Sequence, residues 1–182
     1  MAGFEILLPN GNVTVSSDWV KTGSPPLSND ASFTEIDEGD PADDDTSYIE
    51  NPTVVPVNGN TFEVALQNPS GAVNVGSGAN SWSIFMRARN AGALGGGALT
   101  IDCYQGAVNI SNSGGSTLNV AWGNYVILFD PAAITDANDL RLRCTGNAGA
   151  TFIPRVSLAY LRVKTFTRNQ GAMTLKGTSW ED

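Results

Sequence analysis

The heptapeptide DLRLRCT at residues 139–145 is the clearest structural signal in the sequence. Its apolar residues Leu140, Leu142 and Cys144 alternate with Arg141 and Arg143. A period of two places successive side chains on opposite faces of a pleated strand, whereas a helix repeats about every 3.6 residues. The stretch therefore predicts a β-strand with one face in a hydrophobic core and the other toward solvent.

The same period recurs in both directions along the chain. Residues 82–89 alternate, with Trp82, Ile84 and Met86 on one face and Arg87 and Arg89 on the other. Further strands are expected at residues 62–67, 125–130 and 155–163, and in a row formed by Leu99, Ile101 and Cys103. Residues 125–130 and 155–163 have apolar residues on both faces, which indicates central or interface-facing strands.

Turn signals separate these runs, among them Asn10-Gly11, Asn58-Gly59 and the glycine-rich residues 92–97. Eight or so strands without amphipathic helices predict an all-β fold, a jelly-roll-like antiparallel β-sandwich. We expect one domain over residues 1–182, with a core at about 19–163 and extended arms at 1–18 and 164–182. One helical turn is expected within residues 131–140, capped by Thr135 or Asp136.

The net charge of −8 comes from one segment of the chain. Residues 35–50 hold eight acids and no base, which leaves ten acids and ten bases elsewhere. An acidic segment without a basic stripe disfavours nucleic acid as a direct partner. The chain has neither a long apolar stretch nor a secretory signal, so we expect no membrane contact and synthesis in a cytoplasm.

Catalytic chemistry finds little support in the residue types. Histidine is absent, which removes Ser-His and Cys-His nucleophile arrangements. The glycine-rich residues 91–98 lack the Lys and Ser/Thr of a phosphate loop, and Cys103 and Cys144 are expected to be buried thiols. A pair of carboxylates acting on a glycosidic bond stays open as a distant alternative. The sequence therefore predicts a protein that is not an enzyme and has no cofactor.

Two groups of residues are candidates for ligand binding. Asp40, Asp43, Asp44 and Asp45 offer the oxygen ligands that calcium prefers, but they lack the EF-hand pattern, and a solvated acidic loop is the favoured interpretation. Four tryptophans would stack on sugar rings if exposed. The parity of Trp82 places it in the core, and Trp180 suits an anchor in a partner's pocket. Trp19 and Trp122 remain as candidates for stacking on a sugar.

Several segments, in this order, resemble structural proteins of tailed bacteriophages, particularly marine ones. They are Trp19, residues 36–38, residues 43–45, Tyr48 with Ile49, residues 134–136, residues 139–143 and residues 155–163. The resemblance implies a β-rich virion protein without enzymatic activity. The short single domain suits a head decoration or cement protein more than a fibre with long repeats.

Two functions follow as hypotheses. The first is a capsid decoration protein at the virion surface, a symmetric homo-oligomer that binds the major capsid protein and copies of itself through Leu161, Val163 and Trp180. The alternative is a carbohydrate-binding module on a phage tail fibre or on a polysaccharide-active protein. An exposed Trp122 and Tyr125, together with a calcium site, would favour the alternative.

Overall fold

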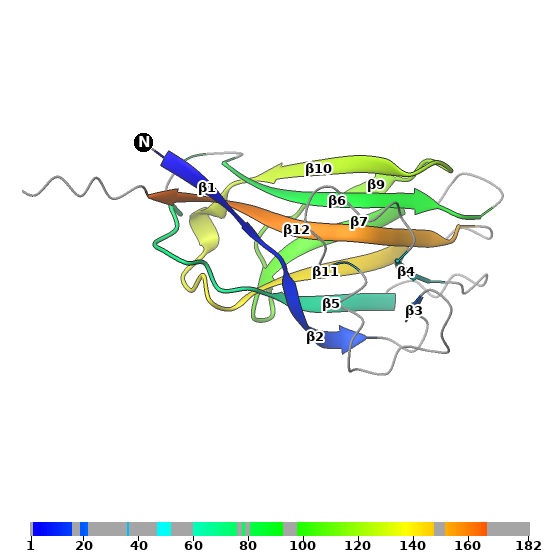
Figure 1. Ribbon diagram of the computed structural model, residues 1–182, viewed down its shortest axis with the longest axis horizontal. Coiled ribbons are helices and arrows are strands. Elements are labelled where there is room, and N and C mark those ends of the chain that lie inside the picture. Colours follow the sequence, from blue (N-terminus) through cyan, green and yellow to red (C-terminus); the bar gives the residue numbers. More distant parts are fainter. Residues whose placement is uncertain are drawn as a thin grey trace, which may run out of the picture.

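The fold is a sandwich of two antiparallel β-sheets (Figure 1). The computed structural model describes residues 2–15, 19–21, 36, 47–51, 60–75, 78, 81–92, 98–147 and 152–166, and the structural statements below concern these residues. Within them, no helix has the length and apolar character needed to cross a membrane. The predicted fold class, an all-β antiparallel sandwich, is confirmed.

The first sheet, sheet A, has the strand order β10-β6-β12-β4-β3, and β1 pairs with β12. Every pairing in it is antiparallel. β1 and β4 pair with opposite ends of the long central strand β12. The strands are β1 (Ala2–Leu7), β3 (Val20–Lys21), β4 (Ile49–Glu50), β6 (Trp82–Asn90), β10 (Gly123–Phe129) and β12 (Pro154–Phe166).

The second sheet, sheet B, has the order β2-β5-β11-β7-β8, and the short β9 also pairs with β7. Its pairings are antiparallel as well. The strands are β2 (Pro9–Val15), β5 (Asn60–Leu66), β7 (Ala98–Gln105), β8 (Val108–Asn109), β9 (Gly115–Thr117) and β11 (Leu140–Asn147).

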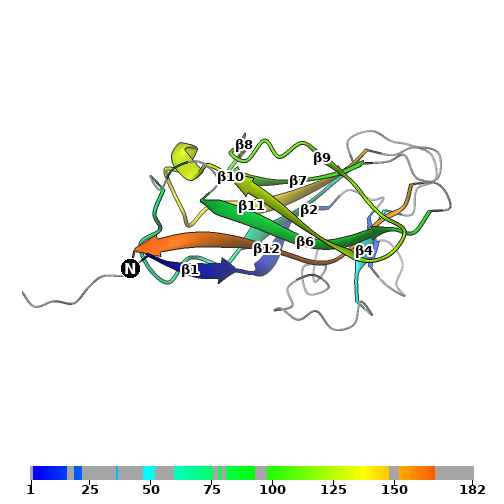
Figure 2. The ribbon, with the colours of Figure 1, turned by 90° about the horizontal axis from the view of Figure 1, so that it is seen from above.

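Successive long strands alternate between the sheets. From β5 in sheet B the chain passes to β6 in sheet A, back to β7, and then through β10 and β11 to β12. Figure 2 shows the two layers from above, with β12 and β6 in one layer and β7 and β11 in the other. This alternation is the wrapping of a jelly roll, in which two packed sheets bury their facing surfaces.

The inner faces of the sheets carry the core that the alternation predicts. Leu140, Leu142 and Cys144 of β11 are buried, and so are the inward residues of β6 and β7. Large aromatic side chains fill the sandwich between them. Trp82 packs edge-on against Phe129, and Trp19 packs against Phe62, each with 6.2 Å between ring centroids.

The N-terminal residues belong to the sandwich, where the sequence predicted an arm over residues 1–18. β1 pairs with β12, and after Leu8 the chain crosses to sheet B, where β2 pairs with β5. The expected arm at 164–182 also begins late, because β12 continues to Phe166. Residues 167–182, including Trp180, lie outside the described part of the chain.

The predicted helical turn is a short 3-10 helix, Pro131–Ala133, with a different cap from the one expected. Asp130, not Thr135 or Asp136, occupies the N-cap position, and its carboxylate accepts a hydrogen bond from the Ala132 N–H. Both of the predicted caps instead donate their backbone N–H groups to Gln105 of β7. These contacts bind the connection between β10 and β11 to sheet B.

Candidate functional site

A row of charged and aromatic side chains crosses the outer face of sheet A near β4. Arg89 of β6 pairs directly with Arg155 of β12, which in turn pairs with Glu50 of β4. Because Gly123 pairs with Ala88, Trp122 lies at the next position along, beside Arg89. We call the set the aromatic–arginine patch, and it consists of Tyr48, Glu50, Arg87, Arg89, Trp122 and Arg155.

A β-bulge in β12 gives Arg155 its outward position. Val156 pairs with the buried Ala88, but the next paired residue is Leu158, opposite Arg87, so Ser157 is the extra residue. Strict alternation from Ala159, which faces the core, would turn Arg155 inward. One added residue reverses the facing of a strand from that point. The bulge therefore aligns Arg155 with the outward side chains of β6.

Each aromatic ring of the patch lies close to guanidinium groups. The Arg89 guanidinium carbon lies 5.2 Å from the centroid of the Trp122 ring, and that of Arg87 lies 6.0 Å from it. The Arg155 guanidinium lies 4.5 Å from the Tyr48 centroid. The two rings are neighbours, with centroids 6.0 Å apart and planes tilted by 58°. These distances are those of cation–π contacts, which hold rings and cations in one layer.

The charges of the patch are unbalanced. Nε of Arg155 donates to a Glu50 carboxylate oxygen at 2.6 Å, and Nη1 of Arg87 donates to the Asn124 side-chain oxygen at 3.2 Å. Arg89 has no ion pair with any described residue, and its Nε atom is buried without a hydrogen-bond partner. Among the described residues the patch holds three guanidinium groups and one carboxylate, that of Glu50, although the chain as a whole carries a net charge of −8.

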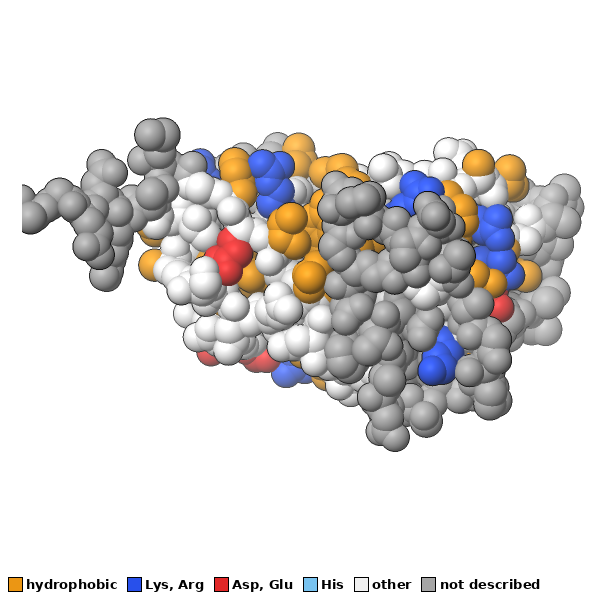
Figure 3. All heavy atoms as spheres, viewed as in Figure 1, with side chains coloured by type: hydrophobic (Ala, Val, Ile, Leu, Met, Phe, Trp, Pro, Cys, Tyr) orange, Lys and Arg blue, Asp and Glu red, His pale blue; other side chains and the backbone are white. Residues whose placement is uncertain are grey.

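The patch is open to solvent in part. Tyr48, Arg87, Arg89, Trp122 and Arg155 are all partly exposed. Figure 3 views this face and shows Lys and Arg side chains beside hydrophobic ones at the end of the molecule where β4 lies in Figure 1. A surface of this kind can contact an apolar ring and donate hydrogen bonds to polar groups at its rim.

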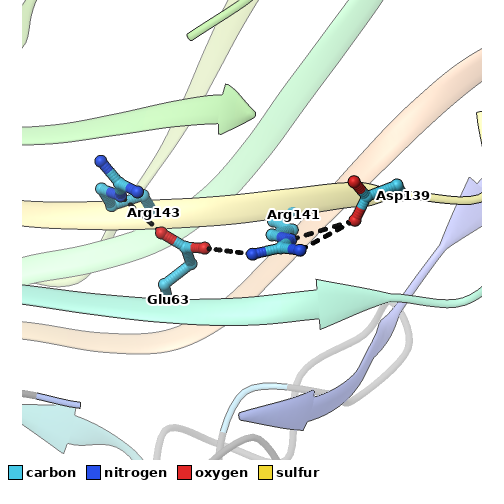
Figure 4. Close-up of polar contacts among 4 residues, drawn as sticks. All are labelled: Glu63, Asp139, Arg141 and Arg143. Atoms are coloured by element: carbon cyan, nitrogen blue, oxygen red, sulfur yellow. Dashed lines mark hydrogen bonds and ion pairs between the residues drawn. The ribbon is translucent and has the colours of Figure 1, made fainter. Parts of the chain in front are cut away.

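A second polar group lies on the outer face of sheet B (Figure 4). Glu63 of β5 accepts hydrogen bonds from Arg141 and Arg143 of β11, and Asp139 accepts two from Arg141. The bonds to Asp139 raise the pKa of Arg141 above its ordinary value. Arg143 also lies over the Tyr104 ring, at 3.8 Å from its centroid. Two cations and two carboxylates satisfy one another here, which indicates a structural role.

Both cysteines are buried free thiols, as the sequence predicted. They lie on neighbouring strands, since Cys103 pairs with Leu142 and Cys144 pairs with Ile101. Burial, with a smaller effect from the charge of Asp102, raises the pKa of the Cys144 thiol to about 12 and that of Cys103 well above its usual range. Neither thiol is therefore a nucleophile at neutral pH.

The predicted interface residues are placed differently from the expectation. Leu161 and Val163 are 0% exposed and belong to the core between the sheets, so they offer no exposed surface to a partner. They face inward because Leu161 pairs with Ile84 and Leu7, on the core side of β12. The third, Trp180, lies outside the described residues, so its anchor role stays a prediction.

The calcium candidates Asp40, Asp43, Asp44 and Asp45 also lie outside the described residues. Within the described ranges, no group of three or more His, Cys, Asp or Glu side chains is placed to hold a metal ion.

The two sugar-binding candidates fall in different environments. Trp122 is partly exposed and belongs to the patch, as a stacking residue requires. Tyr125 points inward instead, packs against the core and accepts a hydrogen bond from the Asn119 N–H at its hydroxyl. Trp19 is fully buried.

Comparisons with known proteins give a likeness of shape only. No family model and no curated protein matches the chain. Among solved structures, it is similar to the C-terminal CBM6 of LamC, a marine laminarinase from Zobellia galactanivorans, with 11% identity, a TM-score of 0.47, and 90% of this chain and 100% of that chain covered.

Two further solved structures are similar. TmCBM61 in complex with β-1,4-galactotriose has 9% identity, a TM-score of 0.40, and 87% and 86% coverage of this chain and that chain. A family 29 carbohydrate binding module from Piromyces equi has 10% identity, a TM-score of 0.38, and 93% and 94% coverage. At these values the likeness is one of β-sandwich shape, and conclusions about a ligand depend on the chain's own side chains.

Proposed function

We propose that the chain is a non-catalytic binding module that holds a glycan on the aromatic–arginine patch of sheet A. The observation that carries the proposal is the pair of neighbouring rings, Trp122 and Tyr48, each accompanied by a guanidinium group. A sugar ring presents an apolar face of C–H groups that packs on an aromatic ring, while its hydroxyl groups accept hydrogen bonds from arginine. The patch supplies both kinds of contact side by side.

The patch is also held in place before a ligand arrives. Arg87, Arg89, Arg155 and Glu50 lie on three adjacent strands whose register is fixed by backbone pairing. A site on paired strands loses less conformational entropy on binding than a site on separate loops. The similar solved structures are carbohydrate-binding modules by name, but at their TM-scores they add no weight to this proposal.

The test is a glycan array followed by titration calorimetry on the best polysaccharide. Trp122→Ala is expected to weaken binding by roughly tenfold, because it removes the stacking surface. Phe4→Ala is the matched control, since Phe4 is an exposed aromatic residue on β1, away from the patch. Equal loss in both variants, or no glycan bound by the unmodified protein, would overturn the proposal.

A virion structural role is the second candidate, and a row of exposed apolar side chains favours it. Val126 and Leu128 are each 56% exposed on β10, which ends the strand order of sheet A, and Phe4, Ile6 and Phe166 are exposed on β1 and β12. Exposed apolar side chains on an edge strand suit contact with another subunit. We propose copies of the chain and a capsid protein as partners and the virion surface as the location. A glycan-binding module on a tail fibre would combine both functions.

Sedimentation analysis separates the two candidates. Self-association that is lost in the double variant Val126→Lys/Leu128→Lys, with glycan binding unchanged, would support an assembly role for β10. A monomer at every concentration tested would count against the homo-oligomer.

A further inference from the structure

We infer that the glycan on the aromatic–arginine patch carries an anionic group, a carboxylate or a sulfate ester, which Arg89 binds. This inference rests on the proposed glycan-binding function and adds to it the chemical class of the ligand. It follows from the relation of Arg89 to Arg155, from the hydrogen bonding of the Arg89 side chain, and from its position beside Trp122.

Charge is unevenly compensated across the strands of the patch. Arg89 and Arg155 are directly paired, and like charges at directly opposed positions of a sheet repel each other. Glu50 neutralises Arg155 through the contact at 2.6 Å, whereas no described carboxylate approaches Arg89. An anion at Arg89 would complete a row in which two central cations each have one negative neighbour.

The hydrogen bonding of the Arg89 side chain is incomplete. Buried polar atoms in folded proteins nearly always have a partner, but its Nε atom has none. No hydrogen bond joins its terminal nitrogens to a described residue either, so the guanidinium group is short of acceptors. A carboxylate or sulfate on its terminal nitrogens would supply charge-assisted hydrogen bonds, and the planar fork of arginine matches the geometry of such an anion.

The position of Arg89 beside Trp122 favours an acidic sugar over a small anion. The Arg89 guanidinium lies over the partly exposed Trp122 ring at 5.2 Å, so a group bound to one lies near the other. A ligand that uses both must present an apolar face next to a negative charge. A uronic acid residue or a sulfated sugar has this combination, and a neutral sugar leaves the charge of Arg89 unmatched.

The experiment compares neutral and anionic polysaccharides of the same backbone type. De-esterified against fully methyl-esterified polygalacturonate tests the carboxylate, and dextran sulfate against dextran tests the sulfate ester. Binding is measured by affinity electrophoresis and calorimetry at about 50 mM and about 500 mM NaCl, because screening weakens contacts between charges. We expect at least one anionic polymer to bind about tenfold more tightly than its neutral counterpart, and less tightly at the higher salt concentration.

Variants assign the effect to Arg89. Arg89→Gln is expected to reduce binding of the anionic polymer to the level of the neutral one while keeping the melting temperature. Arg162→Gln is the matched control, because Arg162 is an exposed arginine on β12 that lies over Phe4, outside the patch. Binding should be unchanged in this variant.

Three results would overturn the inference, and each is distinct. Equal binding of neutral and anionic polymers, unaffected by Arg89→Gln but lost in Trp122→Ala, would leave the proposed function standing without the charge requirement. Absence of binding to all four polymers and to a glycan array would remove both proposals. Equally tight binding of single-stranded DNA, reduced alike by Arg89→Gln and Arg162→Gln, would mean general attraction of polyanions.

Discussion

Arg89 and Arg155 occupy directly paired positions on β6 and β12, yet their guanidinium groups lie over different rings, Trp122 and Tyr48. Separate rings hold the two cations apart and partly offset their repulsion. Among the described residues, Arg155 has a carboxylate partner, Glu50, and Arg89 has none. The two arginines are therefore unequal, since Arg155 is held by an ion pair within the sheet, and Arg89 is the one that we propose to bind the ligand.

The unequal roles predict unequal effects on stability. Glu50→Gln should lower the free energy of unfolding by about 1–2 kcal/mol, because it leaves two adjacent arginines without a counter-ion among the described residues. The side chains of Arg155 and Glu50 are 22% and 19% exposed, so solvent screens the pair only in part. Arg89→Gln should change stability by less than about 0.5 kcal/mol. Urea unfolding of both variants measures the difference, and a larger loss in Arg89→Gln would contradict it.

The sheet B network predicts a second pair of unequal variants. The Glu63 side chain is 3% exposed and holds two arginines, whereas that of Asp139 is 45% exposed and holds one. Glu63→Gln should destabilise the fold by about 2 kcal/mol, since a buried acceptor shared by two cations loses its charge. Asp139→Asn should cost less than about 1 kcal/mol. Thermal unfolding of the two variants side by side checks the order, which the opposite ranking would refute.

The buried thiols predict a loss of stability in alkali. Burial raises the pKa of Cys144 from the ordinary value of 9.0 to about 12, and that of Cys103 also rises. Above pH 9 the unfolded chain releases these protons and the folded chain keeps them, so folding becomes less favourable. The contribution is complete below pH 9 and falls by about 1.4 kcal/mol per pH unit for each thiol above it.

The measurement for the thiols is urea unfolding between neutral pH and about pH 10. The double variant Cys103→Ala/Cys144→Ala serves as the reference, because tyrosines and lysines titrate equally in both proteins. A shallower decline with pH is expected in the double variant. Identical declines would show that the thiols contribute nothing to it.

The turn between β7 and β8 contains a position that favours glycine over alanine. Gly106 has a φ of 56°, and a Cβ atom there would lie 3.3 Å from a carboxylate oxygen of Asp139. Gly106→Ala should lower the stability by about 1–2 kcal/mol through strain in the left-handed region. Gly71→Ala is the control, since a Cβ atom there meets nothing within 4 Å. Comparable losses in the two variants would contradict the strain argument.

Local alternation predicts the interior strands well and the N-terminal ones poorly. The inward residues of β6, β7 and β11 follow directly from a period of two. In β1 the pattern misleads, because the apolar Phe4 and Ile6 face solvent while Glu5 pairs with the buried Val163. The strand is held by its backbone pairing with β12, which no local pattern reveals. An N-terminal arm was therefore predicted where two strands exist.

The candidate site could be predicted only in part, for a related reason. The sequence alone predicts that Arg87 and Arg89 face outward, and it marks Trp122 as a candidate for stacking on a sugar. Glu50 belongs to a strand of two residues, which is too short for any periodicity. Glu50 lies 105 residues before Arg155 in the sequence, and the register of β4 on β12 brings the two side chains together. Contacts set by register between distant strands cannot be derived from local pattern.

The bulge at Ser157 divides β12 into two segments in which odd-numbered residues face opposite sides of the sheet. Before the bulge, odd-numbered residues such as Arg155 face solvent, and after it, odd-numbered residues such as Leu161 fill the core. Deleting this single residue would leave a strand that alternates regularly, with Arg155 still outward and Leu161 still in the core. The bulge thus absorbs one residue of chain length, and the same residue types keep the same faces of β12 on both sides of it.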